Sequence, residues 1–226
     1  KWFDTNYHYL VPELDADSTF DGGPTWFLDE VDEALALGLA TRPVLIGPVT
    51  YLYLSKSHVP GFDRLTLLPK VVQAYRRILA QLRERGIEWV QIDEPVLCLD
   101  IDAEWLDAMD RAYRDLADAP PKVLLATYFD TAAPHAARAA ALPVHGFHID
   151  LVRAPKQLET WLRVLPANAV LSAGVIDGRN IWRADLRAVL VRKSHEFIVL
   201  PILVWRGLQF VLRQHDFAEH ARGRDA

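Results

Sequence analysis

The sequence has little cysteine and no long uncharged apolar run, and each absence excludes a class of protein. Cys98 is the single cysteine among 226 residues, so the chain forms no internal disulfide and cannot supply two thiolate ligands to a metal. The most apolar stretch, residues 197–212, is shorter than the ~20 residues of a membrane-spanning helix and contains Arg206 and Gln209. We therefore expect a buried or interfacial segment there, no membrane partner and a cytoplasmic protein.

The sequence also lacks an excess of positive charge. The formal net charge is -5 at pH 7, and the Lys and Arg residues are scattered among acidic ones rather than clustered. A protein that binds a phosphate backbone usually presents a concentrated basic surface. Nucleic acid is therefore not an expected partner.

Sequence patterns typical of several catalytic sites are missing as well. There are eight His residues but no His-x-Cys, Cys-x-x-Cys or His-Glu-x-x-His spacing, so no zinc site is indicated. There is no Gly-x-Gly-x-x-Gly turn, no Gly-x-Ser-x-Gly elbow and no phosphate loop. The sequence predicts that this chain binds no metal or cofactor.

What the chain does contain is an alternation of helical and strand patterns. With 51% hydrophobic and 24% charged residues, it has the composition of an ordinary globular domain. An aromatic-rich loop at 1–24 comes first. Helical periodicity then predicts helices at 26–39, 65–85, 104–116, 132–141 and 155–164, and short apolar runs predict strands at 43–48, 87–93, 122–129, 146–152 and 169–175. Such alternation requires parallel strands with right-handed crossovers, in either an open doubly wound sheet or a (β/α)8 barrel.

Polar residues at the ends of the predicted strands favour the barrel. Asp93-Glu94, residues 128–130, residues 148–150 and residues 177–179 all follow or end a strand, which is where barrel enzymes build their sites. A complete barrel takes about 250 residues. We therefore predict an α/β fold that is TIM-barrel-like and incomplete. A chain that begins with Lys1 rather than Met also favours a fragment.

The first candidate site residues are Asp93 and Glu94. Pro95 excludes helical geometry at Glu94 and is expected to direct the carboxylates into the barrel mouth. The alternative is that Asp93 caps a turn or pairs with an arginine. His148 and Asp150 share one face of a strand and could orient an imidazole or bind a hydroxylated ligand; the alternative is a hydrogen-bonded core histidine.

A third candidate pair is Asp177 and Arg179, on either side of Gly178 in a tight turn. They would face the mouth or form an ion pair that closes the loop. The aromatic and polar side chains of residues 4–9 suit a flat heteroaromatic ligand. They would equally serve as a lid over the barrel.

Four segments resemble the amino-terminal domain of the cobalamin-independent methionine synthase family. They are KWFDTNYHYLVPEL at 1–14, RPVLIGPVTYLYLSK at 42–56, WVQIDEPVL at 89–97 and LSAGVIDGRNIWRADL at 171–186. The resemblance covers residues 1–187. It implies two (β/α)8 barrels face to face, and methyl transfer from 5-methyltetrahydropteroyl polyglutamate to homocysteine. It also implies a zinc held by His, Cys, Glu and Cys in the carboxyl-terminal barrel, and a folate contact at Lys1.

The sequence departs from the family pattern at both ends. The family's basic segment and first strand or strands, expected before Lys1, are missing, and residues from about 190 onward resemble nothing in the family. We therefore predict a partial barrel domain at 1–187 and a divergent tail at 188–226.

The resemblance predicts the folate-binding half of the enzyme, inactive without a companion carboxyl-terminal half. One alternative is a non-catalytic remnant or interaction module. Another is a separate enzyme on a barrel like that of uroporphyrinogen decarboxylases, using Asp93, Glu94 and His148.

Overall fold

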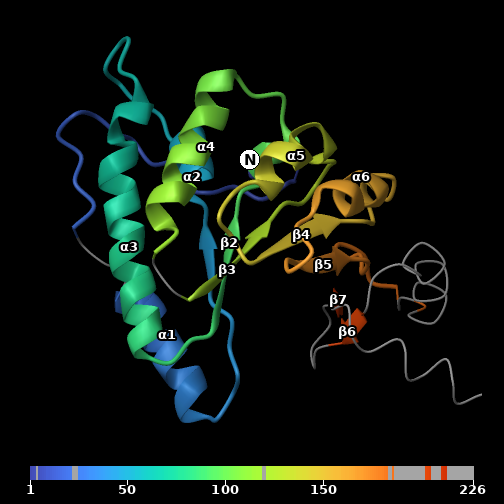
Figure 1. Ribbon diagram of the computed structural model, residues 1–226. Coiled ribbons are helices and arrows are strands. Elements are labelled where there is room, and N and C mark those ends of the chain that lie inside the picture. The colour runs from blue at the N-terminus through green and yellow to red at the C-terminus, as the bar shows by residue number, and fades with distance from the viewer. Residues whose placement is uncertain are drawn as a thin grey trace, which may run out of the picture.

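The computed structural model describes residues 1–3, 5–21, 25–118, 121–182, 185, 202–204 and 210–212. The amino-terminal loop is followed by alternating helices and strands (Figure 1). The α-helices are α1 (Thr25–Ala36), α2 (Pro48–Leu54), α3 (Leu68–Glu84), α4 (Ala103–Leu116), α5 (Ala136–Ala140) and α6 (Gln157–Val164). The strands are β1 (Val44–Ile46), β2 (Trp89–Asp93), β3 (Lys122–Ala126), β4 (Gly146–Asp150), β5 (Val170–Gly174), β6 (Ile202–Val204) and β7 (Phe210–Leu212).

The order of the strands identifies the architecture. Strands β1 to β5 lie side by side in chain order and every neighbouring pair is parallel. A doubly wound sheet reverses its order at a switch point, whereas a barrel adds each strand next to the last. The fold is therefore α/β, TIM-barrel-like and incomplete, as the sequence predicts. β7 pairs with β5 in antiparallel orientation, and β6 pairs with β7.

Alternating burial along the strands separates the two faces of the sheet. In β2, Val90 and Ile92 are fully buried beneath the helices, while Gln91 and Asp93 point to the opposite, inner face. The α3 helix buries one stripe of side chains, including Leu79 and Leu82, as its apolar periodicity predicts. The main core therefore lies between the sheet and the helices.

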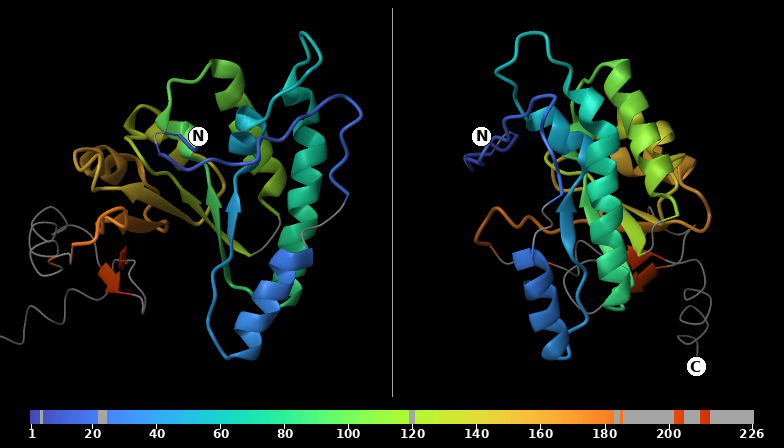
Figure 2. Two further views of the ribbon diagram at one scale, coloured as in Figure 1. Left: turned by 180° about the vertical axis from the view of Figure 1, so that it is seen from behind. Right: turned by 90° about the vertical axis from the view of Figure 1, so that its left-hand side faces the viewer.

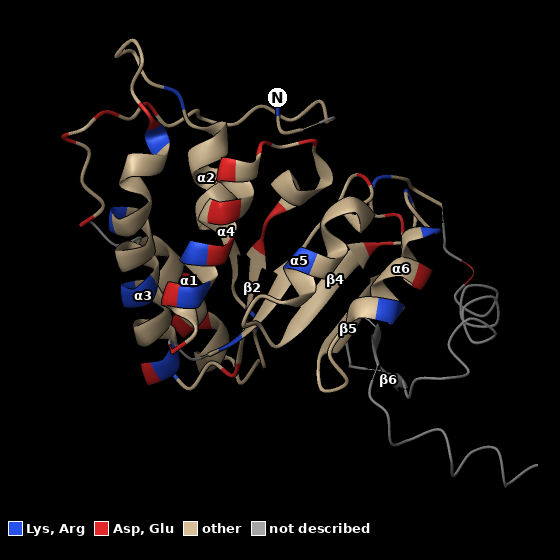
Figure 3. Cartoon of the chain, turned by 45° about the horizontal axis from the view of Figure 1, so that its top comes forward, with Lys and Arg blue, Asp and Glu red and all other residues tan. Residues whose placement is uncertain are grey.

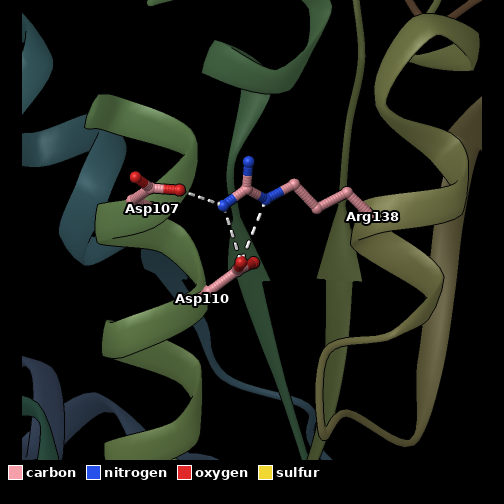
Figure 4. A network of polar contacts seen from close by, with 3 residues as sticks. All are labelled: Asp107, Asp110 and Arg138. Carbon is pink, nitrogen blue, oxygen red and sulfur yellow. Dashed lines mark hydrogen bonds and ion pairs between the residues drawn. The ribbon is translucent and has the colours of Figure 1, made fainter. Parts of the chain in front are cut away.

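Ion pairs link neighbouring helices on the outside of this core. Arg138 of α5 donates from Nη2 to Asp110 of α4 at 2.7 Å and also contacts Asp107 (Figure 4). These two carboxylates raise the pKa of the Arg138 guanidinium, and the hydrogen bond to Asp110 has the larger effect. Elsewhere, Arg85 pairs with Asp32 at 2.8 Å where α1 lies against the end of α3 (Figure 2). Exposed pairs of this kind each contribute about 1 kcal/mol or less.

The predicted elements are present, with differences at their ends. The helix predicted at 65–85 starts as a 3-10 turn, Arg64–Leu67, and the one predicted at 132–141 is a 3-10 turn followed by a short α5. The α2 helix is not predicted by the sequence. Only β6 and β7 fall within the predicted apolar segment at 197–212; its other residues, and the boundary predicted at 187, lie outside the described residues. None of the described helices is both long and apolar enough to cross a membrane.

Candidate functional site

Five of the six predicted mouth residues gather at the carboxyl ends of the strands. Asp93 ends β2 and Asp150 ends β4. His148 lies two residues before Asp150 on the same face of β4, and Asp177 and Arg179 lie in the loop after β5. Strand pairing aligns Asp93, Ala126, His148 and Ser172 in one row across the inner face. Figure 3, in which this edge of the sheet comes forward, shows acidic residues at the tips of β2 and β4.

Asp93 lies within a chain of hydrogen bonds. Gln91 donates to Asp93 Oδ1 at 2.8 Å, the Tyr128 hydroxyl donates to Oδ2 at 3.0 Å, and Arg42 donates to Gln91 at 3.0 Å. Burial raises the pKa of the Asp93 carboxyl, and the two hydrogen bonds and the Arg42 charge partly offset this shift. Both carboxylate oxygens are engaged, so Asp93 is held in a fixed orientation at the mouth.

Glu94 lies apart from the other five residues. Its side chain is fully buried on the helix side of the sheet, and it accepts hydrogen bonds from the amides of Val49 (3.2 Å) and Thr50 (2.8 Å) and from the Tyr113 hydroxyl (3.1 Å). Burial raises its pKa to about 7, and these hydrogen bonds work in the opposite direction. The two amides belong to the first turn of α2 and have no acceptor within the helix. The Glu94 carboxylate supplies that acceptor and so stabilises the start of α2.

His148 is a nearly buried imidazole on the inner face of β4. Its Nδ1 lies 2.9 Å from Ser172 Oγ on β5. Its ring covers Gly174, where a Cβ would come within 2.9 Å of Nε2. Burial, assisted by the Arg42 charge, lowers the pKa of His148 to about 4, while Asp150 acts in the opposite direction. The imidazole is therefore neutral at neutral pH.

The depressed pKa of His148 predicts how stability depends on pH. Below the ordinary value of 6.5 the unfolded chain binds a proton that the folded chain does not accept until about pH 4. The contribution of His148 to the free energy of unfolding is thus fully present above pH 6.5. It decreases by about 3 kcal/mol as the pH falls towards 4. We expect His148→Gln to lack this part of the pH dependence in denaturant unfolding measured from pH 7 to 4. The control His8→Gln alters an exposed histidine and should retain it; parallel curves for His148→Gln and the original chain would contradict the prediction.

Asp150 organises the backbone of two loops. Its Oδ1 accepts the amides of Val152 and Arg153 at 2.9 Å, and its Oδ2 accepts the amide of Phe129 at 3.2 Å. Phe129 has a positive φ of 79°, which a residue with a large side chain rarely adopts. Asp150 therefore helps to hold a strained residue at the mouth.

Asp177 closes the loop that follows β5. It accepts the Arg179 amide at 2.9 Å and the Asn180 side-chain amide at 2.7 Å, and these bonds lower the pKa of its carboxyl. The Arg179 guanidinium lies over the ring of Phe129, 5.7 Å from its centroid. These hydrogen bonds close the turn, and Arg179 lines the pocket at the mouth.

The amino-terminal residues pack onto the same place. The Trp2 side chain hydrogen-bonds the Tyr128 hydroxyl, and the rings of Phe3 and Phe129 are 6.2 Å apart. Phe3 also has a positive φ, 46°. Lys1, which is exposed, therefore stands beside the mouth.

A pocket of ≈ 280 Å³ opens between the ends of β4 and β5. Its lining includes Phe129, His148, Asp150, Arg153, Asp177 and Arg179. Sequence reasoning did not single out Ser172, Gln91 or Arg42 as neighbours of this mouth. The signal for Gln91 and Ser172 was present, because both occupy inward-facing strand positions.

The described part of the chain contains no group of three or more His, Cys, Asp or Glu side chains placed to hold a metal ion. The mouth instead combines hydrogen-bonded carboxylates, a neutral imidazole, guanidinium groups and aromatic rings. Such a donor set suits binding and orienting an organic molecule with polar groups.

Comparison with known proteins gives consistent matches. The family model described as "Cobalamin-independent synthase, N-terminal domain" matches residues 1–195. The 5-methyltetrahydropteroyltriglutamate–homocysteine methyltransferase of Paraburkholderia xenovorans is 67% identical over 84% of this chain and 25% of its own length. That of Burkholderia mallei is 54% identical over 85% of the chain and 25% of its own length. The chain thus spans about a quarter of the length of these curated relatives.

Two solved structures share the fold. A vitamin-B12-independent methionine synthase structure from Listeria monocytogenes superimposes with a TM-score of 0.62 at 16% identity, over 81% of this chain and 62% of that one. A B12-independent methionine synthase from Shewanella sp. W3-18-1 gives 0.64 at 13% identity, over 83% and 60%. At these identities the likeness concerns the fold alone.

Proposed function

The chain belongs to the cobalamin-independent methionine synthase family, within its amino-terminal domain, and on that basis we propose that it forms the folate-holding part of such an enzyme. The ligand would be a 5-methyltetrahydropteroyl polyglutamate, the substrate class named in its relatives. The observation that carries the proposal is the family match over residues 1–195. The barrel mouth described above supplies the surface for it.

Lys1 is the proposed folate contact in this chain. Its neighbours Trp2 and Phe3 pack on Tyr128 and Phe129, so the backbone next to Lys1 lies at the mouth. Folate polyglutamates combine a flat heteroaromatic ring with a tail of carboxylates. An ammonium beside aromatic surfaces is chemically suited to both parts.

The remaining mouth residues have proposed supporting roles. Asp93 and Asp150 hold the mouth in shape through their hydrogen bonds, Asp177 fixes the loop after β5, and His148 and Arg179 face the pocket. Glu94 would act only through the start of α2. None of these groups is proposed to take part in bond making or breaking.

The methyl transfer itself is proposed to need a companion carboxyl-terminal half. Zinc, when bound there, would supply homocysteine as a thiolate at neutral pH. The residues of this chain do not fit such a site: the sequence has one cysteine, and burial raises the pKa of the Cys98 thiol to about 12. We further propose a barrel domain at 1–187, a separate tail at 188–226, and a cytoplasmic location.

We expect Lys1→Ala to weaken binding of 5-methyltetrahydropteroyl triglutamate about 10-fold, equivalent to about 1.4 kcal/mol. The change removes one cation from an exposed position, so stability should stay within about 0.5 kcal/mol of the original. Calorimetric titration measures the affinity. Lys122→Ala is the matched control, because Lys122 is the first residue of β3, at the end of the strand away from the mouth. Equal affinities for all three proteins would remove Lys1 from the proposed site.

A further inference from the structure

We propose that the pocket between the carboxyl ends of β4 and β5 binds a small monocarboxylate, whose oxygen accepts a hydrogen bond from His148 Nε2–H. The pocket lies within the same barrel mouth as the proposed folate surface, but Lys1 is not one of its lining residues. The proposal stands whether or not the chain holds folate. Three properties of the pocket support it: the fixed tautomer of His148, the donor-rich lining and the small apolar wall.

The tautomer of His148 follows from the surroundings of Ser172. The Ser172 side chain is fully buried, and within the described part of the chain its hydroxyl has one polar contact, His148 Nδ1 at 2.9 Å. A buried hydroxyl that accepted from Nδ1 would leave its own proton without a partner, which costs about 1–3 kcal/mol. The hydroxyl therefore donates to Nδ1. The proton of the neutral imidazole is then on Nε2.

Nε2 is available to a ligand at the floor of the pocket. It lies over Gly174, and both His148 and Gly174 line the pocket. Nε2 has no hydrogen-bond partner among the described residues, and protein atoms do not enclose it completely. His148 is thus a nearly buried side chain whose remaining donor points into the pocket.

The other polar groups of the pocket also favour an acceptor ligand. The oxygens of Asp150 and Asp177 already accept loop hydrogen bonds. Arg153 and Arg179 are exposed at the rim, and both are close enough for their charges to lower the pKa of Asp177. Each guanidinium carries five N–H donors and no acceptor. Both arginines also have other interactions, but with five donors each they make the lining mainly donor in character, which fits carboxylate oxygens.

Charge balance and size narrow the class of ligand. Two carboxylates and two guanidinium groups line the pocket, so a singly charged anion suits it better than a phosphate dianion. The ring of Phe129 and the side chains of Val152 and Val175 form an apolar wall. The pocket volume of ≈ 280 Å³ lies just below the range of pockets that hold drug-sized ligands. The structure therefore points to a short-chain aliphatic carboxylic acid.

The test follows the ring nitrogens of His148 by ¹⁵N NMR of the full chain during titration with butyrate. The free protein should show the Nε2–H tautomer, and butyrate should shift the Nε2 signal saturably. Butyramide, which has the same body without the charge, should bind at least 10-fold more weakly. The opposite tautomer, no shift with butyrate, or an equal response to butyramide or to inorganic phosphate would each overturn the proposal.

Variants separate a ligand contact from a structural role. Arg179→Gln should weaken butyrate binding about 10-fold, whereas Arg163→Gln should not, since Arg163 pairs with Glu159 on the surface of α6. Ser172→Ala should release His148 from the Nε2–H tautomer in the same spectra and weaken butyrate binding. If Ser172→Ala fails to fold, the two arginine variants decide the matter, and unchanged affinity in Arg179→Gln would contradict the proposal.

Discussion

Replacing Gly47 by alanine should lower the free energy of unfolding by about 4 kcal/mol or prevent folding altogether. A Cβ at this position would lie 2.0 Å from Glu94 Cδ and 2.2 Å from Glu94 Oε1. The Glu94 carboxyl cannot move away, because it is fully buried and accepts hydrogen bonds from Val49, Thr50 and Tyr113. Moving it would leave several buried donors without partners.

Denaturant unfolding of three variants isolates this contact. Gly178→Ala is the matched control, because nothing lies within 4 Å of its added Cβ, and its stability should stay within about 0.5 kcal/mol of the original. Glu94→Ala should itself be destabilising, but adding Gly47→Ala to it should cost little, since the clashing carboxyl is gone. Additive losses in the double variant, or a stable Gly47→Ala chain, would show that the contact is not close.

The second large effect concerns activity: we expect the chain alone to form no methionine above the uncatalysed background. Under the proposed function, the thiolate-activating zinc belongs to a companion carboxyl-terminal half. The chain's own thiol, Cys98, is partly buried and donates to the Asp130 carbonyl at 3.3 Å. With its pKa raised to about 12, it stays protonated at neutral pH and is a poor metal ligand or nucleophile.

The assay supplies methyl-tetrahydropteroyl triglutamate, homocysteine and zinc, and measures methionine with and without a carboxyl-terminal half from a relative. Product should appear only with that half, and Cys98→Ser should not change the yield. Turnover by the chain alone would refute the proposed division of labour. Turnover by the added half alone, unchanged by this chain, would favour the remnant or interaction module.

The fold was predictable because its main signals are local in sequence. The apolar stripe of α3 and the short buried runs of β2 and β4 encode element type directly. The α2 helix escaped prediction because its start depends on Glu94, which is 44 residues away from Thr50 in the sequence. A tertiary hydrogen bond of that kind leaves no local periodicity.

The candidate site was predictable in position but not in detail. Strand-end polarity correctly gathered Asp93, His148, Asp150 and the loop at 177–179. The prediction that Glu94 faces the mouth is wrong, because strict alternation after Asp93 turns its side chain to the helix side. The tautomer of His148 was beyond sequence reasoning, because it depends on Ser172, a neighbour fixed only by strand register.

The most direct test of the central claim is calorimetric titration of the full chain with 5-methyltetrahydropteroyl triglutamate, once cooperative thermal unfolding has been established. We predict saturable binding at one site, with the stability increase that ligand binding to the folded state produces. A cooperatively folded chain that shows no heat of binding and no stabilisation at any accessible ligand concentration would contradict a folate-holding function.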